Sequence, residues 1–292
     1  MFEKMAKYAK EHFENNLLGD SVINFIRIRG IDEKLLSRGI YKQYSQDVTQ
    51  PSKEMVEARE FYRQNSDRVE RIEHYLEDDE SRKCYQKAIK YRYTHNMEEA
   101  PIYTKKRYFV DGIIELSTNE VFVDAGAFVG DTIRTFYKKT HGKYKKIIAF
   151  EPDQYNFQML SKLKYKDVLK YNCGLWSSND KLHFTNGGGC GSRMSEEGAA
   201  ISVEVRRLDD IEECQEATFI KMDIEGSELQ ALKGATSIIK NKHPKLAICL
   251  YHSDEDMLDI IEYIHEIEPR YKLYVRHHSI AAAEDVVYAI YK

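Results

Sequence analysis

The hydrophobic pattern of the chain changes near Thr118. Before this point, apolar residues recur at roughly helical intervals among many charged ones, as in Val56, Phe61, Val69, Ile72 and Leu76. Pro51 and the capping residues Ser52 and Ser81 mark helix boundaries in this part. We therefore predict a helical N-terminal region over residues 1–117. It would serve as a cap, a lid or an acceptor-recognition element, and is where we expect any dimer contact.

After Thr118, short β-prone runs alternate with helical segments, which is the pattern of a parallel sheet with crossover helices. Residues 118–292 are thus predicted to form an α/β domain. We expect seven strands: Val121–Asp124, Ile147–Glu151, Val168–Asn172, Thr218–Asp223, Lys245–Tyr251, Tyr271–Arg276 and Val286–Tyr291. Two further segments, KLHFT and ISVEVRRL, predict a β hairpin around the glycine- and serine-rich loop 186–198.

The most informative stretch is VFVDAGAFVGD, residues 121–131, which predicts a strand, a glycine turn and the start of a helix. Gly126 has no Cβ, so a flat cofactor could approach the backbone, and Gly130 opens a helix whose free N–H groups favour a negative group. The run IIAFEPD, residues 147–153, brings Glu151 to the end of the neighbouring strand. Because a carboxylate there can accept both hydroxyls of a ribose, we predict a nucleoside-binding site.

The glycine spacing indicates which nucleoside cofactor is bound. Asp124 occupies the position of the first glycine in the dinucleotide fingerprint, so the pattern becomes D-x-G-x-x-x-G. A carboxylate repels a pyrophosphate but can hold an ammonium group, directly or through water. Adenosine joined to an amino acid is S-adenosylmethionine. Two alternatives stay open: Asp124 could merely cap the next helix, and the same fold also hosts nicotinamide-dependent oxidoreductases, against which the missing glycine counts.

Five motifs follow one another in the order seen in one family: VFVDAGAFVGDT, AFEPD, YNCGLWSS, VRRLDD and FIKMDIEGSELQALKGA. On these residues the chain resembles FkbM-type S-adenosylmethionine-dependent methyltransferases, roughly from Phe109 to Lys292. The resemblance implies a class I methyltransferase fold, a Rossmann-like, mostly parallel seven-stranded sheet whose last strand runs antiparallel between the fifth and sixth. It most often implies O-methylation of a hydroxyl on a sugar or natural product.

The motifs and the resemblance together give the candidate cofactor-binding residues. The resemblance places the adenine ring beside residues 172–175, where the alternative is a plain strand-to-loop turn. The full set is Asp124, Gly126, Phe128, Gly130, Asp131, Glu151, Pro152, Asn172, Cys173, Gly174 and Asp223.

The candidate catalytic residues are His252, Asp223 and Glu225. Methyl transfer is an in-line displacement in which the sulfonium leaves as a neutral thioether, so positioning does most of the work. An alcohol acceptor must also lose its proton, for which a base or a metal is needed. Histidine titrates closest to neutral pH, which makes His252 the natural base unless it is only a strand-end structural residue. Asp223 and Glu225 could instead hold Mg²⁺ or Mn²⁺, and Glu225 could simply cap a helix near Gly226.

For the acceptor, the resemblance places KMDIEG beside the methyl group. The substrate-binding candidates are Lys221, Glu228, Tyr251 and Arg276, with Arg276 suited to an acidic or sugar acceptor. Ion pairs with neighbours are the alternative for Lys221, Glu228 and Arg276. His277 and His278 point to opposite faces of a strand, so we predict no metal site there.

Composition limits the remaining possibilities. A net charge of −4 gives no electrostatic footprint for nucleic acid. The five cysteines, at positions 84, 173, 190, 214 and 249, show no CxxC spacing and favour a reduced, cytoplasmic protein. Neither a signal peptide nor a membrane-spanning run is expected. The predicted partner is a small-molecule or glycan acceptor, and a homo-oligomer remains open. Alternative functions are an N- or carboxyl-methyltransferase and a non-catalytic binding module.

Overall fold

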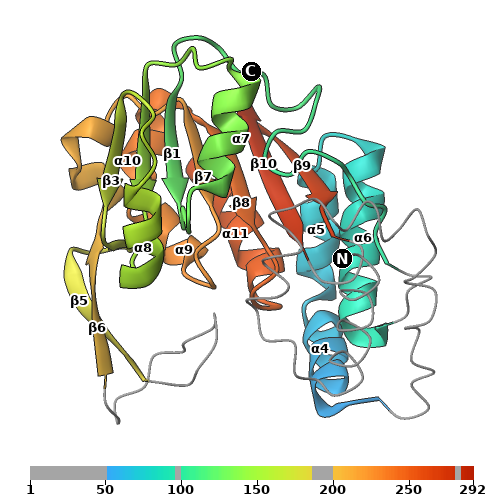
Figure 1. Cartoon of the computed structure of the whole chain (residues 1–292). Helices are drawn as coiled ribbons and strands as arrows, with labels where there is room; N and C mark the ends of the chain where they lie inside the picture. The colour runs from blue at the N-terminus through green and yellow to red at the C-terminus, as the bar shows by residue number, and fades with distance from the viewer. Residues whose placement is uncertain (1–50, 96–99, 186–199, 280–283) are drawn as a thin grey trace, which may run out of the picture.

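The protein is described by a computed structural model that covers residues 51–95, 100–185, 200–279 and 284–292 (Figure 1). The expectations for residues 1–50, for the loop 186–198 and for Cys190 lie outside these described residues. The described part forms a central sheet with helices on both faces and a group of helices beside one edge.

The main sheet has seven strands in the order β3-β2-β1-β7-β8-β10-β9. All neighbouring pairs are parallel except those made by β10, which runs antiparallel to both β8 and β9. This topology confirms the predicted class I methyltransferase fold, including the place of the last strand. The strands span Val121–Ala125 (β1), Lys146–Phe150 (β2), Val168–Tyr171 (β3), Phe219–Met222 (β7), Lys245–Cys249 (β8), Tyr271–His277 (β9) and Asp285–Tyr291 (β10).

The central strands are apolar on both faces because both faces are covered. Every residue of β1 is buried, which is typical of parallel strands between two helical layers. On one face, the aromatic rings of Phe109, Phe122, Phe136 and Phe219 pack together. The helices of the α/β part are α7 (Asp131–Lys139), α8 (Gln154–Ser161), α9 (Glu228–Lys233), α10 (Thr236–Lys242) and α11 (Asp256–Ile267).

The predicted hairpin is present as part of a smaller sheet. Strands β5 (Asp180–Thr185) and β6 (Ala200–Arg206) pair antiparallel, and β4 (Gly174–Leu175) joins β6 in parallel. This sheet extends beyond the lower edge of the main sheet in Figure 1. Two short 3-10 helices, η3 (Leu208–Asp210) and η4 (Glu212–Cys214), lead from β6 towards β7.

The described end of the N-terminal region is helical, as predicted. It contains α4 (Lys53–Gln64), α5 (Ser66–Tyr75) and α6 (Asp79–Thr94). Ser52 caps α4 by accepting a hydrogen bond from the backbone N–H of Met55. The assignment of Ser81 as a cap was wrong: Asp78 caps α6, and Ser81 is the residue whose N–H it accepts. Asp78 also accepts a hydrogen bond from the hydroxyl of Ser81, so both polar residues belong to one cap.

The N-terminal helices share a hydrophobic core with the sheet. Ile72, Leu76 and Tyr85 belong to the same buried cluster as Leu273 on β9. Backbone bridges also join Leu76 to Leu273 and Tyr103 to His277. Residues 108–114 pack on the other face of the sheet, so part of the predicted 1–117 region contributes directly to the α/β core. The boundary between residues 117 and 118 stays a prediction.

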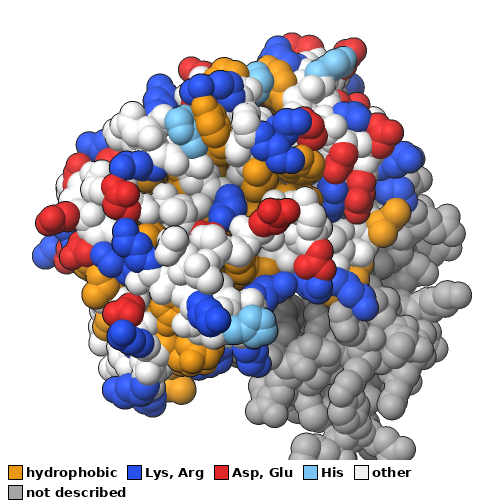
Figure 2. Space-filling view, turned by 90° about the horizontal axis from the view of Figure 1, so that it is seen from above, with side chains coloured by type: hydrophobic (Ala, Val, Ile, Leu, Met, Phe, Trp, Pro, Cys, Tyr) orange, Lys and Arg blue, Asp and Glu red, His pale blue; other side chains and the backbone are white. Residues whose placement is uncertain are grey.

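The surface of the described residues is highly charged. Figure 2 shows the molecule from above the view of Figure 1, so that the amino end of β1 faces the viewer. Acidic and basic side chains are interspersed over this face. Within the described part of the chain, no helix is both long and apolar enough to cross a membrane.

Candidate active site

The turn after β1 is shaped by three residues with positive φ: Gly126 at +71°, Phe128 at +48° and Gly130 at +82°. A Cβ added to Gly126 would lie 1.9 Å from the carbonyl oxygen of Asp223. The glycine is therefore required by close packing of the turn against the end of β7, a reason different from the expected approach of a cofactor. As predicted, Gly130 opens a helix: it is the N-cap residue of α7 and supplies no side-chain cap to the helix N–H groups.

Glu151 lies just beyond β2, next to this turn. Its Oε2 accepts the N–H of Phe128 at 2.7 Å, and its Oε1 accepts the N–H of Asp153 at 2.9 Å. Burial raises the pKa of Glu151 despite these hydrogen bonds. Because each oxygen keeps a further lone pair, the carboxylate is held in a fixed position and can still accept a pair of hydroxyls. Asn172 supports the same place by donating to the carbonyls of Glu151 and Pro152.

Asp124 is fully buried under the turn. Its Oδ1 lies 3.0 Å from Nζ of Lys221, which also donates to the carbonyls of Ala125 and Gly126. Burial raises the pKa of Asp124 to about 7, although the charge of Lys221 opposes this rise. Neither oxygen of Asp124 receives a well-aligned hydrogen bond from a described residue. The carboxylate is thus a buried acceptor that Lys221 only partly satisfies.

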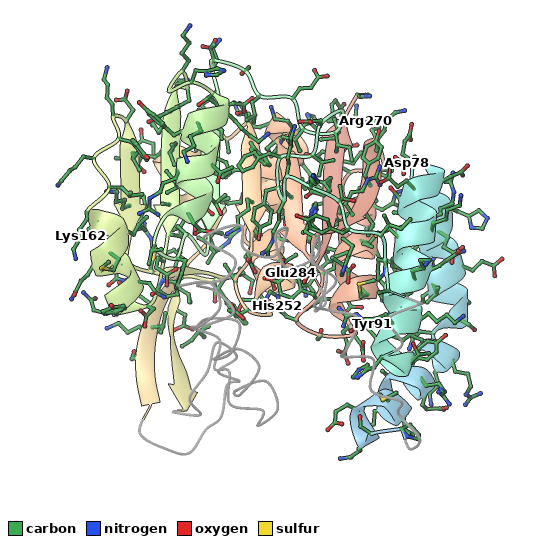
Figure 3. All side chains as sticks on the ribbon, turned by 45° about the vertical axis from the view of Figure 1, so that its right-hand side comes forward. Asp78, Tyr91, Lys162, His252, Arg270 and Glu284 are labelled. Atoms are coloured by element: carbon green, nitrogen blue, oxygen red, sulfur yellow. The ribbon has the colours of Figure 1, made fainter. Side chains whose placement is uncertain are left out.

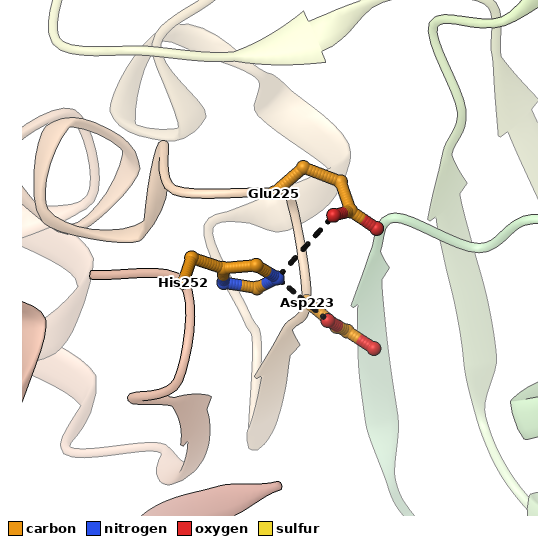
Figure 4. Close-up of side chains that lie close together, drawn as sticks. All are labelled: Asp223, Glu225 and His252. Atoms are coloured by element: carbon orange, nitrogen blue, oxygen red, sulfur yellow. Dashed lines mark ion pairs between the residues drawn. The ribbon is translucent and has the colours of Figure 1, made fainter. Parts of the chain in front are cut away.

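The three predicted catalytic residues come together beyond β7 and β8. Nε2 of His252 lies 3.6 Å from Oδ1 of Asp223 and 3.5 Å from Oε2 of Glu225 (Figure 4). Glu225 has a φ of +57°, an uncommon conformation for a residue with a Cβ, and its side chain is 50% exposed. The cluster therefore faces solvent on the side of Glu225.

Glu228 holds the residues of this cluster in place. It is fully buried and accepts the backbone N–H groups of Ile224 at 2.7 Å and Gly226 at 3.0 Å. Its Oε1 also lies 3.2 Å from Nδ1 of His252. One carboxylate thus holds both the loop that carries Glu225 and the ring of His252. Both Glu228 and Lys221 are buried, so their expected contact with substrate stays a prediction.

The electrostatics of the cluster differ between its members. Burial disfavours the charged imidazole, but the hydrogen bond and charge of Glu228 and the charges of Asp223 and Glu225 raise the pKa of His252 to about 9. Burial likewise opposes ionisation of Asp223, yet the charges of Arg107 and Lys221 hold its pKa well below the usual range. At neutral pH, the ligand-free site therefore contains an imidazolium beside ionised Asp223.

Sequence reasoning missed the residues that fix Asp223 from the opposite side. Oδ2 of Asp223 accepts from Arg107 at 3.0 Å and from the hydroxyl of Tyr108 at 2.8 Å, while Oδ1 accepts from Tyr251 at 2.6 Å. Arg107 also pairs with Glu284. Arg107 and Tyr108 belong to no motif and precede Asp223 by more than 110 positions, so no local signal pointed to them.

The remaining candidates lie elsewhere or are structural. Arg276 pairs with Asp78 and donates to Ser81, and Asp78 is well separated from His252 in Figure 3. The structure therefore does not bring Arg276 to the cluster. His277 pairs with Asp285, and His278 bonds to Thr104 and Tyr288, so the adjacent histidines have separate partners.

The other cofactor candidates line the turns already described. Asp131 begins α7, Cys173 is buried, and Gly174 begins β4. Their contacts with a cofactor stay predictions.

The seven-stranded sheet, with β10 antiparallel between β8 and β9, is the fold of class I methyltransferases. The Methyltransferase FkbM domain model matches residues 124–272, and the chain belongs to this family. It is similar to Methyltransferase FkbM from Methylobacillus flagellatus KT, with a TM-score of 0.67 and 29% identity over 78% of this chain and 59% of that one. It is also 30% identical to Methyltransferase sdnD of Sordaria araneosa over 44% of this chain and 66% of that protein. The chain thus spans less than two thirds of either relative.

S-adenosylmethionine is the methyl donor that this family implies, and the residues present fit it. Glu151 has acceptor capacity for a ribose, and the turn at residues 126–130 leads into a helix N-terminus without a side-chain cap. The poorly satisfied oxygens of Asp124 lie under the same turn. Asp124 is fully buried and lies beside Lys221. It would therefore bind the ammonium group of S-adenosylmethionine through water or after a local opening of the turn, and not by direct contact.

Proposed function

We propose that the protein transfers a methyl group from S-adenosylmethionine to a hydroxyl of a sugar, glycan or secondary metabolite. The observation that carries this proposal is the contact between the turn after β1 and the end of β7. Gly126 lies against the carbonyl of Asp223, so the cofactor turn is adjacent to the cluster of Asp223, Glu225 and His252. A bound methyl donor and groups able to handle a proton would therefore share one small region.

The reaction requires little covalent chemistry from the protein. The acceptor oxygen forms a bond to the methyl carbon, the carbon–sulfur bond breaks, and the thioether leaves with the bonding electrons. The hydroxyl proton must depart, and the cluster around His252 is the place where it would do so. A nitrogen or carboxylate acceptor would have less need of this cluster, so its presence favours a hydroxyl.

The cluster is not a ready base in the ligand-free chain. Asp223 accepts three hydrogen bonds and stays ionised, and His252 holds its own proton at neutral pH. A nearby positive charge lowers the pKa of His252 by disfavouring the imidazolium. The sulfonium of the bound donor supplies one such charge, which would make His252 a better proton acceptor in the complex.

The N-terminal region also contributes residues to the proposed site. Arg107 and Tyr108 belong to the predicted 1–117 region and hold Asp223 in place. Of the substrate-binding candidates, Tyr251 lies in the cluster, where its hydroxyl donates to Asp223. We propose that acceptor recognition involves this side of the site, between the N-terminal region and the end of β8.

The first experiment is calorimetric titration of the purified full chain with S-adenosylmethionine and, separately, with NAD. We expect micromolar binding of S-adenosylmethionine and no binding of NAD. Glu151→Gln should weaken the binding at least tenfold, because the amide nitrogen is not an acceptor for the ribose. Glu212→Gln, a matched change at an exposed glutamate, should leave it unchanged. Unchanged binding in Glu151→Gln would remove the role of Glu151, whereas absence of S-adenosylmethionine binding in the wild type, or preference for NAD, would overturn the proposed cofactor.

A second experiment addresses the acceptor. Methyl transfer from labelled donor to a panel of sugars, glycans and small carboxylic acids should label hydroxyl compounds. His252→Ala should reduce the rate with an alcohol by roughly a hundredfold, the scale of general acid–base assistance, and should affect a carboxylate little. Equal loss for both acceptor classes, with donor binding intact, would remove the reason for preferring a hydroxyl.

A further inference from the structure

The side chains of Asp223, Glu225 and His252 present three donor atoms to one point. Each contributes one potential ligand atom, and these atoms all lie within 4.8 Å of one another. We propose that the three residues bind a single divalent cation of the Mg²⁺ or Mn²⁺ class, which in turn takes the hydroxyl oxygen of the acceptor. The role of the ion in methyl transfer rests on the proposed function, whereas its binding does not.

The arrangement around His252 is the one expected of a metal ligand. Metal-bound histidines almost always direct their second ring nitrogen to a carboxylate or carbonyl. Here Nδ1 lies 3.2 Å from the buried carboxylate of Glu228, and Nε2 is left facing Asp223 and Glu225. Both ring nitrogens are shielded from solvent and have no well-aligned hydrogen bond to a described residue, but Nδ1 has the carboxylate of Glu228 on its own side, whereas Nε2 lies between two other carboxylates. A buried nitrogen without such a partner, between two carboxylates, indicates a missing ligand.

The carboxylates are positioned in the same way. Glu228 accepts the N–H groups of Ile224 and Gly226, which flank Glu225, and so holds the backbone of this residue at a positive φ. Asp223 is fixed by Arg107 and Tyr108 through Oδ2, while its Oδ1 faces His252 and also accepts the hydroxyl of Tyr251 at 2.6 Å. Supporting hydrogen bonds of this kind are typical of ligating carboxylates.

The local charge also favours a cation. The imidazole is surrounded by three acids, Asp223, Glu225 and Glu228. The guanidinium of Arg107 pairs with Asp223 and also with a fourth acid, Glu284. Lys221 also acts on Asp223, but these four acids still outnumber the two cations, Arg107 and Lys221, when His252 is neutral. A divalent ion at Nε2 would supply positive charge between Asp223 and Glu225.

The two carboxylate oxygens need to move only slightly towards Nε2, and all three ligand atoms lie within 4.8 Å of one another. Adjacent ligands of an octahedral ion at about 2.1 Å lie roughly 3.0 Å apart, compared with the 3.5 and 3.6 Å separations from Nε2. Three protein ligands leave coordination positions for the acceptor oxygen and water. The ion would lower the pKa of the bound hydroxyl, and the proton would pass to solvent beside the half-exposed Glu225.

A second group of possible ligands, Glu228, His252 and Asp256, is less suitable. Glu228 and Asp256 are both buried, which leaves no open side for an acceptor. The group that includes Glu225 has that open side.

The test is direct binding of the metal. The full chain is stripped with a chelator, the chelator is removed, and Mn²⁺ binding is followed by the loss of the free-ion electron paramagnetic resonance signal. We expect one Mn²⁺ per chain, displaced by excess Mg²⁺. Glu225→Gln and His252→Ala should each weaken binding at least tenfold, whereas Glu212→Gln, the exposed control, should not change it. Glu225 is half-exposed, so Glu225→Gln is expected to leave the fold intact.

Calorimetry with S-adenosylmethionine on the same stripped samples separates this inference from the proposed function. Donor binding without a stoichiometric Mn²⁺ site, or Mn²⁺ binding equal in wild type and Glu225→Gln, would overturn the metal site and leave His252 as the base. Mn²⁺ binding that depends on Glu225 and His252, without any donor binding, would support the site and remove the proposed methyl transfer.

Discussion

Replacing Gly126 with alanine should disrupt the cofactor turn and the end of β7 together. The new Cβ would lie 1.9 Å from the carbonyl oxygen of Asp223, roughly 1.5 Å short of a favourable contact. Backbone atoms cannot rotate away, so the turn and the strand end must move apart. The left-handed φ of +71° costs about 1 to 2 kcal/mol for alanine. The overlap adds about 1 to 3 kcal/mol, the usual range for overpacking.

We therefore expect Gly126→Ala to lose about 2 to 5 kcal/mol of unfolding free energy, the sum of the two contributions. The measurement is urea denaturation, combined with calorimetric titration of S-adenosylmethionine on protein that is still folded. Donor binding should be weakened, because the loop that carries Phe128, the N–H donor to Glu151, is displaced.

Gly112→Ala is the matched control. Gly112 has a similar φ of +78°, but a Cβ placed there would meet no heavy atom within 4 Å. This variant should lose only the conformational part, about 1 to 2 kcal/mol, and should bind the donor as wild type does. Equal stability losses for the two variants, with unchanged donor binding in both, would refute the argument that Gly126 is needed for close packing.

Two further changes test the electrostatics. In metal-free protein, His252 should titrate near pH 9 by NMR. Its folded pKa lies above the unfolded value of 6.5, so its contribution of up to about 3 kcal/mol is fully present below pH 6.5 and lost as the pH rises through 9. His252→Ala should flatten the pH dependence of stability in this window, and a titration near 6.5 would contradict the assigned partners. Arg276→Ala should cost about 1 to 3 kcal/mol, because Ser81 loses a buried partner while the part-exposed Asp78 can be solvated, yet leave donor binding and the KM for the acceptor unchanged. A raised KM without loss of stability would restore Arg276 as an acceptor ligand.

The fold could be predicted because its signals are local. Each strand of the main sheet is a short apolar run between polar or glycine-containing turns, and all seven were found to within two residues at either end. The order of the strands, however, came from the family resemblance, since the residues of β10 do not themselves specify a place between β8 and β9. The error at Ser81 was also local: both Asp78 and Ser81 are capping residue types, and only the geometry of α6 distinguishes them.

The site was predictable where its residues follow strand ends and unpredictable where they come from distant segments. Asp223, Glu225 and His252 were found because β7 and β8 are neighbours whose carboxyl ends lie at one edge. Arg107 reaches Asp223 only through the packing of residues 108–114 on the sheet. The burial of Lys221 and Glu228 depends likewise on tertiary packing, which sequence spacing does not reveal.

The bridges from the N-terminal region to β9 have a consequence for how the molecule meets its neighbours. An outer strand offers unpaired backbone groups that recruit strands from other chains. Here Glu77 donates its N–H to the carbonyl of Leu273, and Thr104 donates to that of His277, so this margin is protected at two points. A version of the protein that began at residue 118 would lack both bridges and present β9 to solvent. We expect such a truncated chain to aggregate, and any natural assembly of the intact protein to avoid strand pairing through β9.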